Sequence, residues 1–137
     1  MFKITRAQNT LFEQAALSTF EEALVARGAK LAPALAASLG DDRMRAFVRA
    51  AIAQAARHGF TLKGPVRLFV ELTFLFGSGF DTDARHPWAR ASLEGDPGLG
   101  QLRRASSLHA ASLEALRRIQ RSSNLHDDPA LRRLSTP

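Results

Sequence analysis

Two aspartates and a histidine that lie close together in the chain are the side chains best suited to chemistry. The carboxylates of Asp81 and Asp83 and the imidazole of His86 could ligate a hard or borderline cation. An EF-hand loop starting at Asp81 is excluded, because it would need an oxygen ligand, a glycine and a glutamate where the chain has Arg85, His86 and Ser92. We predict instead that the aspartates accept hydrogen bonds from nearby backbone N–H groups, and that no metal is bound.

Ser78 lies between Gly77 and Gly79, which superficially resembles a nucleophile elbow or a phosphate-binding loop. An elbow joins a strand to a helix with the spacing G-x-S-x-G, which is absent here. A phosphate loop needs a following Lys-Ser or Lys-Thr pair, which is also absent. We therefore expect the two glycines to adopt positive φ angles and reverse the chain. The sequence predicts no enzymatic activity and no cofactor.

Arginines near the C-terminus suggest a different chemistry, the binding of phosphate groups. Two pairs lie about four helical turns apart on a predicted helix and could form an exposed stripe, as nucleic-acid-binding proteins present. No helix-turn-helix spacing or aromatic stacking platform accompanies them, so solvated helix surface is the simpler interpretation. The residues of this alternative site are Arg103, Arg104, Arg117, Arg118 and Arg121.

An apolar run over residues 65–76 must position the aspartates that follow it. Its alternation of apolar and polar residues fits a half-buried strand. A helix fits as well, because Pro65 suits a first turn and Gly77 suits a C-terminal stop. No second strand is predicted elsewhere to pair with it, and an unpaired strand would leave its backbone groups unsatisfied. We predict a buried central helix, with Arg67 and Glu71 one turn apart on its exposed side.

The rest of the chain also shows helical periodicity. A first helix is expected from a cap at Thr5 to about Arg27, ended or loosened by Gly28, with an apolar stripe through Phe12 and Leu24. A short helix from Pro33 and a longer one over residues 42–58 follow. Further helices are predicted over residues 87–93 and 99–121, the last lined by smaller apolar residues and therefore weakly docked or completed by a partner.

These elements predict an all-α fold, a single compact bundle of about five to six helices around the central hydrophobic helix. Residues 1–121 would form one domain, and residues 122–137 a tail with a short helical turn. The chain of 137 residues has 45% hydrophobic and 23% charged residues, which are ordinary values for a folded domain. Its net charge of +6 is compatible with an acidic partner or with solubility alone.

Composition also bears on the compartment. The chain has no cysteine, which excludes disulfides and thiolate metal sites. Its first residues lack the apolar core of a signal peptide, and no run of about 18 apolar residues could cross a membrane. We expect a cytoplasmic protein without a membrane partner; a homo-oligomer is compatible with the sequence.

Two segments, residues 47–59 and 69–89, resemble a family of small helical proteins encoded beside type VI secretion and Rhs-type toxin effectors in Gram-negative bacteria. The most specific part is the run GSGFDTDARHPWA over residues 77–89. The similarity covers roughly residues 4–93 and is weaker near residues 28–33, where the family would have a more regular helix.

The resemblance implies a cytoplasmic accessory protein that binds a cognate secreted toxin or effector, either as an adaptor or chaperone or as an immunity protein. It carries no catalytic residue over to this chain. Its implied partner-binding surface is the loop after the central helix, with Trp88 as an alternative anchor for the loop itself. The residues of this loop are Phe80, Asp81, Asp83, Arg85, His86 and Trp88.

Overall fold

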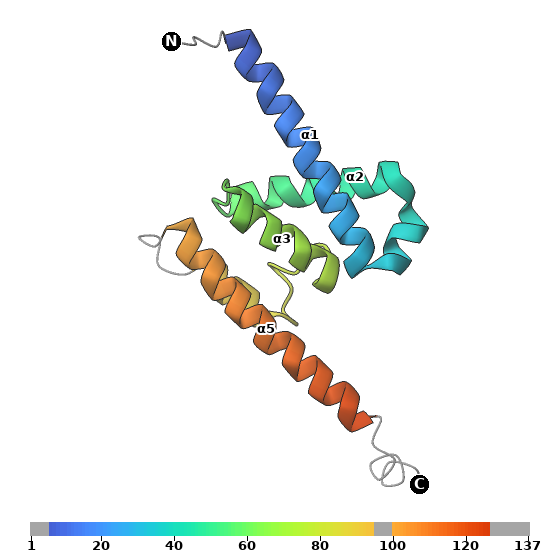
Figure 1. The fold of residues 1–137 in the computed structure, drawn as a ribbon. Helices are drawn as coiled ribbons and strands as arrows, with labels where there is room; N and C mark the ends of the chain where they lie inside the picture. Colours follow the sequence, from blue (N-terminus) through green and yellow to red (C-terminus); the bar gives the residue numbers. More distant parts are fainter. Residues whose placement is uncertain (1–5, 95–99, 127–137) are drawn as a thin grey trace. The chain divides into compact units, whose positions relative to one another are not determined.

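The computed structural model describes residues 6–94 and 100–126, with side chains placed from residue 14 to residue 122 outside that gap. Five helices and no strand are found in these residues, so the predicted all-α fold is confirmed (Figure 1). The helices are α1 (Arg6–Leu31), α2 (Pro33–Arg57), α3 (Lys63–Phe76), α4 (Pro87–Leu93) and α5 (Gln101–His126). No helix in the described part of the chain is long and apolar enough to cross a membrane.

The chain divides into two compact units, residues 1–79 and residues 80–137. Helices α1, α2 and α3 pack against one another in unit 1, and α4 packs against α5 in unit 2. The single domain predicted over residues 1–121 stays a prediction, because the two units are described separately. The predicted cap at Thr5 and the short turn after residue 126 lie outside the described residues.

Helix α3 is the apolar centre of unit 1, as the sequence predicted. It packs on both α1 and α2, and it buries Val66, Phe69, Val70, Leu72 and Phe74. Its predicted boundaries are close to the observed ones, and the backbone N–H of Gly77 donates to the Thr73 carbonyl at 2.9 Å where the helix stops. Arg67 of α3 is exposed, and its ion pair with the half-buried Glu71 is 3.0 Å long.

Helix α2 contains the break that the sequence predicted between two helices. Pro33 opens the element, and Gly40 has φ 75° and ψ 172°, which no helical residue adopts. The longer second part buries Met44, Val48 and Ala51. Its arginines mostly point outward, and Arg49 donates through Nε to both carboxylate oxygens of Glu21, at 3.1 and 3.0 Å.

The prediction for the end of α1 was wrong. The helix continues through Gly28 to Leu31, because Gly28 is needed for close packing and not for termination. A Cβ atom at this position would clash with the ring of Phe74, since three of the ring atoms would lie within 2.7 Å of it. The apolar stripe of α1 is also buried over a shorter length than expected, since Leu24 is 2% exposed whereas Ala16 is exposed. Among the α1 side chains that the structure describes, from residue 14 onward, the buried positions lie between Glu21 and Gly28.

Glu21 is an acidic residue that lies in the packed part of α1. Its side chain is 6% exposed, and it lies in α1 against α2. A buried carboxylate is unfavourable unless it is paired, and the two hydrogen bonds from Arg49 supply that pairing. The charge thus fixes how α1 and α2 meet.

Candidate functional site

The loop between α3 and α4 begins with the two positive-φ glycines that the sequence predicted. Gly77 has φ 96° and Gly79 has φ 81°, a region that other residues rarely adopt. The chain thereby leaves α3 and enters unit 2 at Phe80. Glycine is required at both positions by backbone conformation. Crowding is not the reason, since a Cβ atom at either position would meet no neighbour within 4 Å.

The aromatic residues of unit 2 hold this loop against the start of α4. Phe80 is 1% exposed and stacks on Trp88, with ring centroids 6.3 Å apart. The ring of His86 also lies near Trp88, with ring centroids 5.9 Å apart. Trp88 is half-buried, so it anchors its own loop while part of its ring stays accessible.

The six loop residues predicted to bind a partner fall into two groups. Phe80 and Asp81 are 1% and 2% exposed, and they support the loop from inside. Every buried polar side-chain atom among the described residues has a hydrogen-bond partner, so the Asp81 carboxylate is satisfied. The other four predicted residues reach the surface: Arg85 is exposed, and Asp83, His86 and Trp88 are half-buried.

Asp83 accepts hydrogen bonds from its near neighbour, as the turn interpretation predicted. Its Oδ1 atom accepts the backbone N–H of Arg85 at 2.9 Å, and its Oδ2 atom accepts the Arg85 Nη2 donor at 2.8 Å. The Arg85 side-chain hydrogen bond, followed by the backbone one, lowers the pKa of Asp83 from 3.8 to about 2. The carboxylate and the guanidinium therefore remain a charged pair through mildly acidic pH.

We expect Arg85→Ala to raise the pKa of Asp83 from about 2 partway towards 3.8, because the backbone hydrogen bond remains. The depressed pKa stabilises the folded loop above pH 3.8, and this contribution is lost as the pH falls towards 2. Carboxyl ¹³C chemical shifts followed against pH measure this directly. Arg90→Ala, which removes the separate ion pair with Glu94, should leave the Asp83 titration unchanged; an equal shift in both variants would contradict the assignment.

The aspartates and His86 do not come together as a ligand set. No cluster of three or more His, Asp or Glu side chains suited to a metal ion occurs in the part of the chain that the structure describes. Asp81 is buried, and Asp83 is bonded to Arg85. The two aspartates of the loop therefore have structural roles: Asp81 is buried inside it, and Asp83 is paired with Arg85 at its surface.

Helix α5 exposes both arginines and large apolar side chains. Arg103, Arg117, Arg118 and Arg121 are exposed, and Arg104 is half-buried. Large apolar side chains are exposed beside them: Leu102 at 64%, Leu113 at 40% and Ile119 at 54%. Leu102 and Leu113 are eleven positions apart, about three helical turns, so they lie on the same side of α5.

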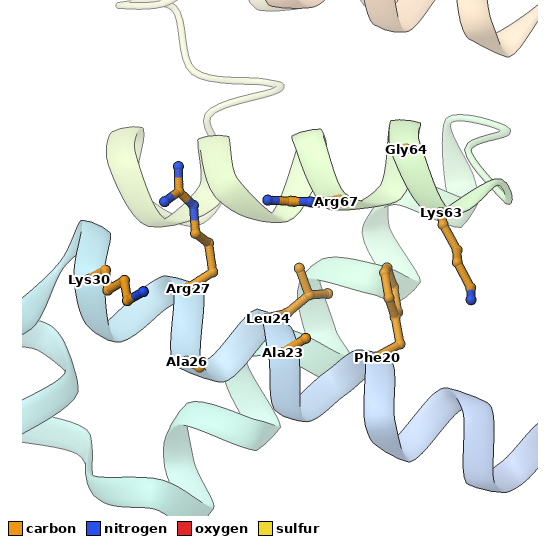
Figure 2. Close-up of a pocket in the computed structure, with 9 residues that line it drawn as sticks. All are labelled: Phe20, Ala23, Leu24, Ala26, Arg27, Lys30, Lys63, Gly64 and Arg67. Carbon is orange, nitrogen blue, oxygen red and sulfur yellow. The ribbon is translucent and has the colours of Figure 1, made fainter.

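The sequence interpretation missed a groove in unit 1 that is lined by α1 and the start of α3 (Figure 2). It encloses about 650 Å³. Phe20 and Leu24 point from α1 towards α3, and four cationic side chains border them. The cations are Arg27, Lys30, Lys63 and Arg67. The helical spacing of Arg27 and Lys30 could have indicated the groove, but the predicted first helix ended at about residue 27, before Lys30.

Comparison with known proteins gives no further assignment. No protein-family model, curated protein or solved structure matches the chain.

Proposed function

We propose that the protein acts by binding another protein, as the cytoplasmic accessory partner of a cognate secreted toxin or effector. The observation that carries this proposal is the exposure of two large apolar side chains, Leu102 and Leu113, on the same side of α5. The motif over residues 77–89, which resembles the effector-associated family, supplies the class of partner. Binding requires no catalytic group.

Helix α5 is much longer than the helix that packs against it in its own unit. Its 26 residues span about 39 Å, whereas the seven residues of α4 span about 10 Å. Helix α4 therefore covers only part of α5. Large apolar side chains left in solvent on a basic helix are typical of a surface that a second protein completes.

The loop at the start of unit 2 offers polar and aromatic side chains that the same partner protein could contact. Trp and Arg are enriched among the residues that dominate binding energy at interfaces. The accessible part of Trp88 and the exposed Arg85 side chain belong to a loop that is held in shape by Phe80 and by Asp83. A preorganised loop of this kind loses little conformational entropy on binding.

The test is co-purification of the tagged chain with the effector encoded next to it. We expect Leu102→Asp with Leu113→Asp to weaken the complex about 100-fold, since two leucines buried on binding contribute on the order of 3 kcal/mol. Asp83→Ala with Trp88→Ala should weaken it as well, while the far-UV circular dichroism stays helical.

The matched control is Leu17→Asp with Leu75→Asp, which places two acids at leucines of unit 1 that are 48% and 40% exposed. This control should retain the complex. The proposal fails if no complex forms with the wild-type chain, or if the control weakens it as much as the α5 variant. Co-expression also separates the two roles: an immunity protein restores survival, whereas an adaptor or chaperone changes only effector solubility or delivery.

Four exposed arginines on α5 favour a second candidate, a basic module that binds nucleic acid. Phosphate binding by such a helix would weaken steeply between about 50 and 200 mM salt. An interface centred on leucines would change little over that range. Binding of the chain to a DNA or RNA duplex with this salt dependence, together with no effector complex, selects the second candidate.

A further inference from the structure

The groove between α1 and α3 combines an apolar floor with a positively charged border, and neither feature is used by the surface of unit 2. Phe20, Ala23 and Leu24 form the floor along one face of α1. Ala23, Ala26 and Gly64 are small and exposed, so a second backbone can approach closely at these positions. The floor runs from Phe20 to Lys30, which is about 15 Å of helix.

The charges around this groove are not balanced within unit 1. Glu71 pairs with both Arg27 and Arg67, at 3.3 and 3.0 Å, so one carboxylate serves two guanidinium groups. Lys30 and Lys63 make no ion pair with any side chain that the structure describes. The groove therefore carries a net positive charge that a ligand could neutralise.

The positions of the two lysines indicate an elongated ligand. Figure 2 shows Lys30 and Lys63 at opposite ends of the groove, with Arg27 and Arg67 between them. A single phosphate group would need cations that converge on one point. Cations spread along an apolar floor instead match a helix that has acidic side chains on either side of an apolar stripe.

We propose that this groove binds an acidic amphipathic helix of the partner protein. Apolar side chains of that helix would contact the half-buried Phe20 and the exposed Ala23, and its carboxylates would pair with Lys30 and Lys63. This inference rests on the proposed protein-binding function and adds a second contact, in unit 1, with a defined chemistry.

The proposal is tested with a synthetic probe that needs no effector. The probe is a labelled helical peptide of about 18 residues with leucine along one face and glutamate elsewhere, and its counterpart has glutamine in place of glutamate. Fluorescence anisotropy should show binding of the glutamate peptide. Lys30→Ala with Lys63→Ala should weaken it about tenfold, the effect of losing two exposed ion pairs.

The control variant, Arg43→Ala with Arg57→Ala, removes the same number of charges from exposed positions of α2 outside the groove, and it should bind like the wild type. The inference is overturned if the glutamate peptide does not bind, if the glutamine peptide binds equally well, or if the control loses as much affinity. It is also overturned if light scattering shows a dimer that the lysine variant abolishes, because a second copy then fills the groove. The two tests can fail independently. If the peptide does not bind, the proposed α5 interface is unaffected; if the effector does not co-purify, the peptide result still reports on the groove.

Discussion

Phe69→Ala is expected to lower the free energy of unfolding by about 3–5 kcal/mol. Phe69 is 1% exposed in the middle of α3. Its ring meets Phe60 edge-on, with centroids 6.4 Å apart, and lies 5.6 Å from the ring of His58. Truncation removes buried apolar surface and leaves a cavity between α2 and α3, because neighbouring aromatic rings cannot collapse into the space.

Urea denaturation followed by far-UV circular dichroism measures this effect. Leu75→Ala is the control, because Leu75 lies in the same helix but is 40% exposed, and its truncation should cost well under half as much. If Phe69→Ala fails to fold, Phe69→Leu should remain folded with a loss of about 1–2 kcal/mol. Equal effects at Phe69 and Leu75 would contradict the placement of α3 at the centre of unit 1.

Gly28→Ala is expected to destabilise the protein by about 1–3 kcal/mol, the usual range for overpacking. The direction is informative, because the same change inside an exposed helix normally stabilises by about 0.5–1 kcal/mol. Here the new methyl group would press on the ring of Phe74. That ring cannot easily move, since it is 7% exposed and packs on Phe47 with centroids 4.7 Å apart.

A double-mutant cycle separates the steric conflict from helix propensity. In a Phe74→Leu background the conflict is relieved, so Gly28→Ala should become neutral or stabilising. Gly64→Ala is the control in the wild-type background, because a Cβ atom there meets nothing within 4 Å. A stabilising Gly28→Ala in the wild type would contradict the close approach of α1 and α3.

Local signals in the sequence were sufficient for most helix boundaries. The proline at residue 87 and the glycine at residue 77 mark observed helix ends, and the break near residue 40 was also expected. Gly28 was misread because the same residue type serves as a helix stop and as a close-packing position, and only the neighbour in space, Phe74, distinguishes them. Helix α5 likewise continues to His126, past the predicted residue 121, because no glycine or proline stops it there.

The sequence indicated the loop but not the groove, because only the groove depends on which residues become neighbours in space. The loop lies within one short segment, so the pairing of Asp83 with Arg85 could be expected from sequence, although the burial of Phe80 and Asp81 could not. The groove combines α1 with α3 residues such as Lys30 and Lys63, which are far apart in the chain. Tertiary packing alone brings such residues together, and periodicity within one helix cannot reveal it.

Amide hydrogen exchange of the chain, free and bound to the proposed effector partner, tests the central claim most directly. Binding through α5 predicts slower exchange over residues 101–122 in the complex, with the loop at residues 83–88 also protected. Unchanged exchange in α5 while another surface becomes protected would contradict the claim.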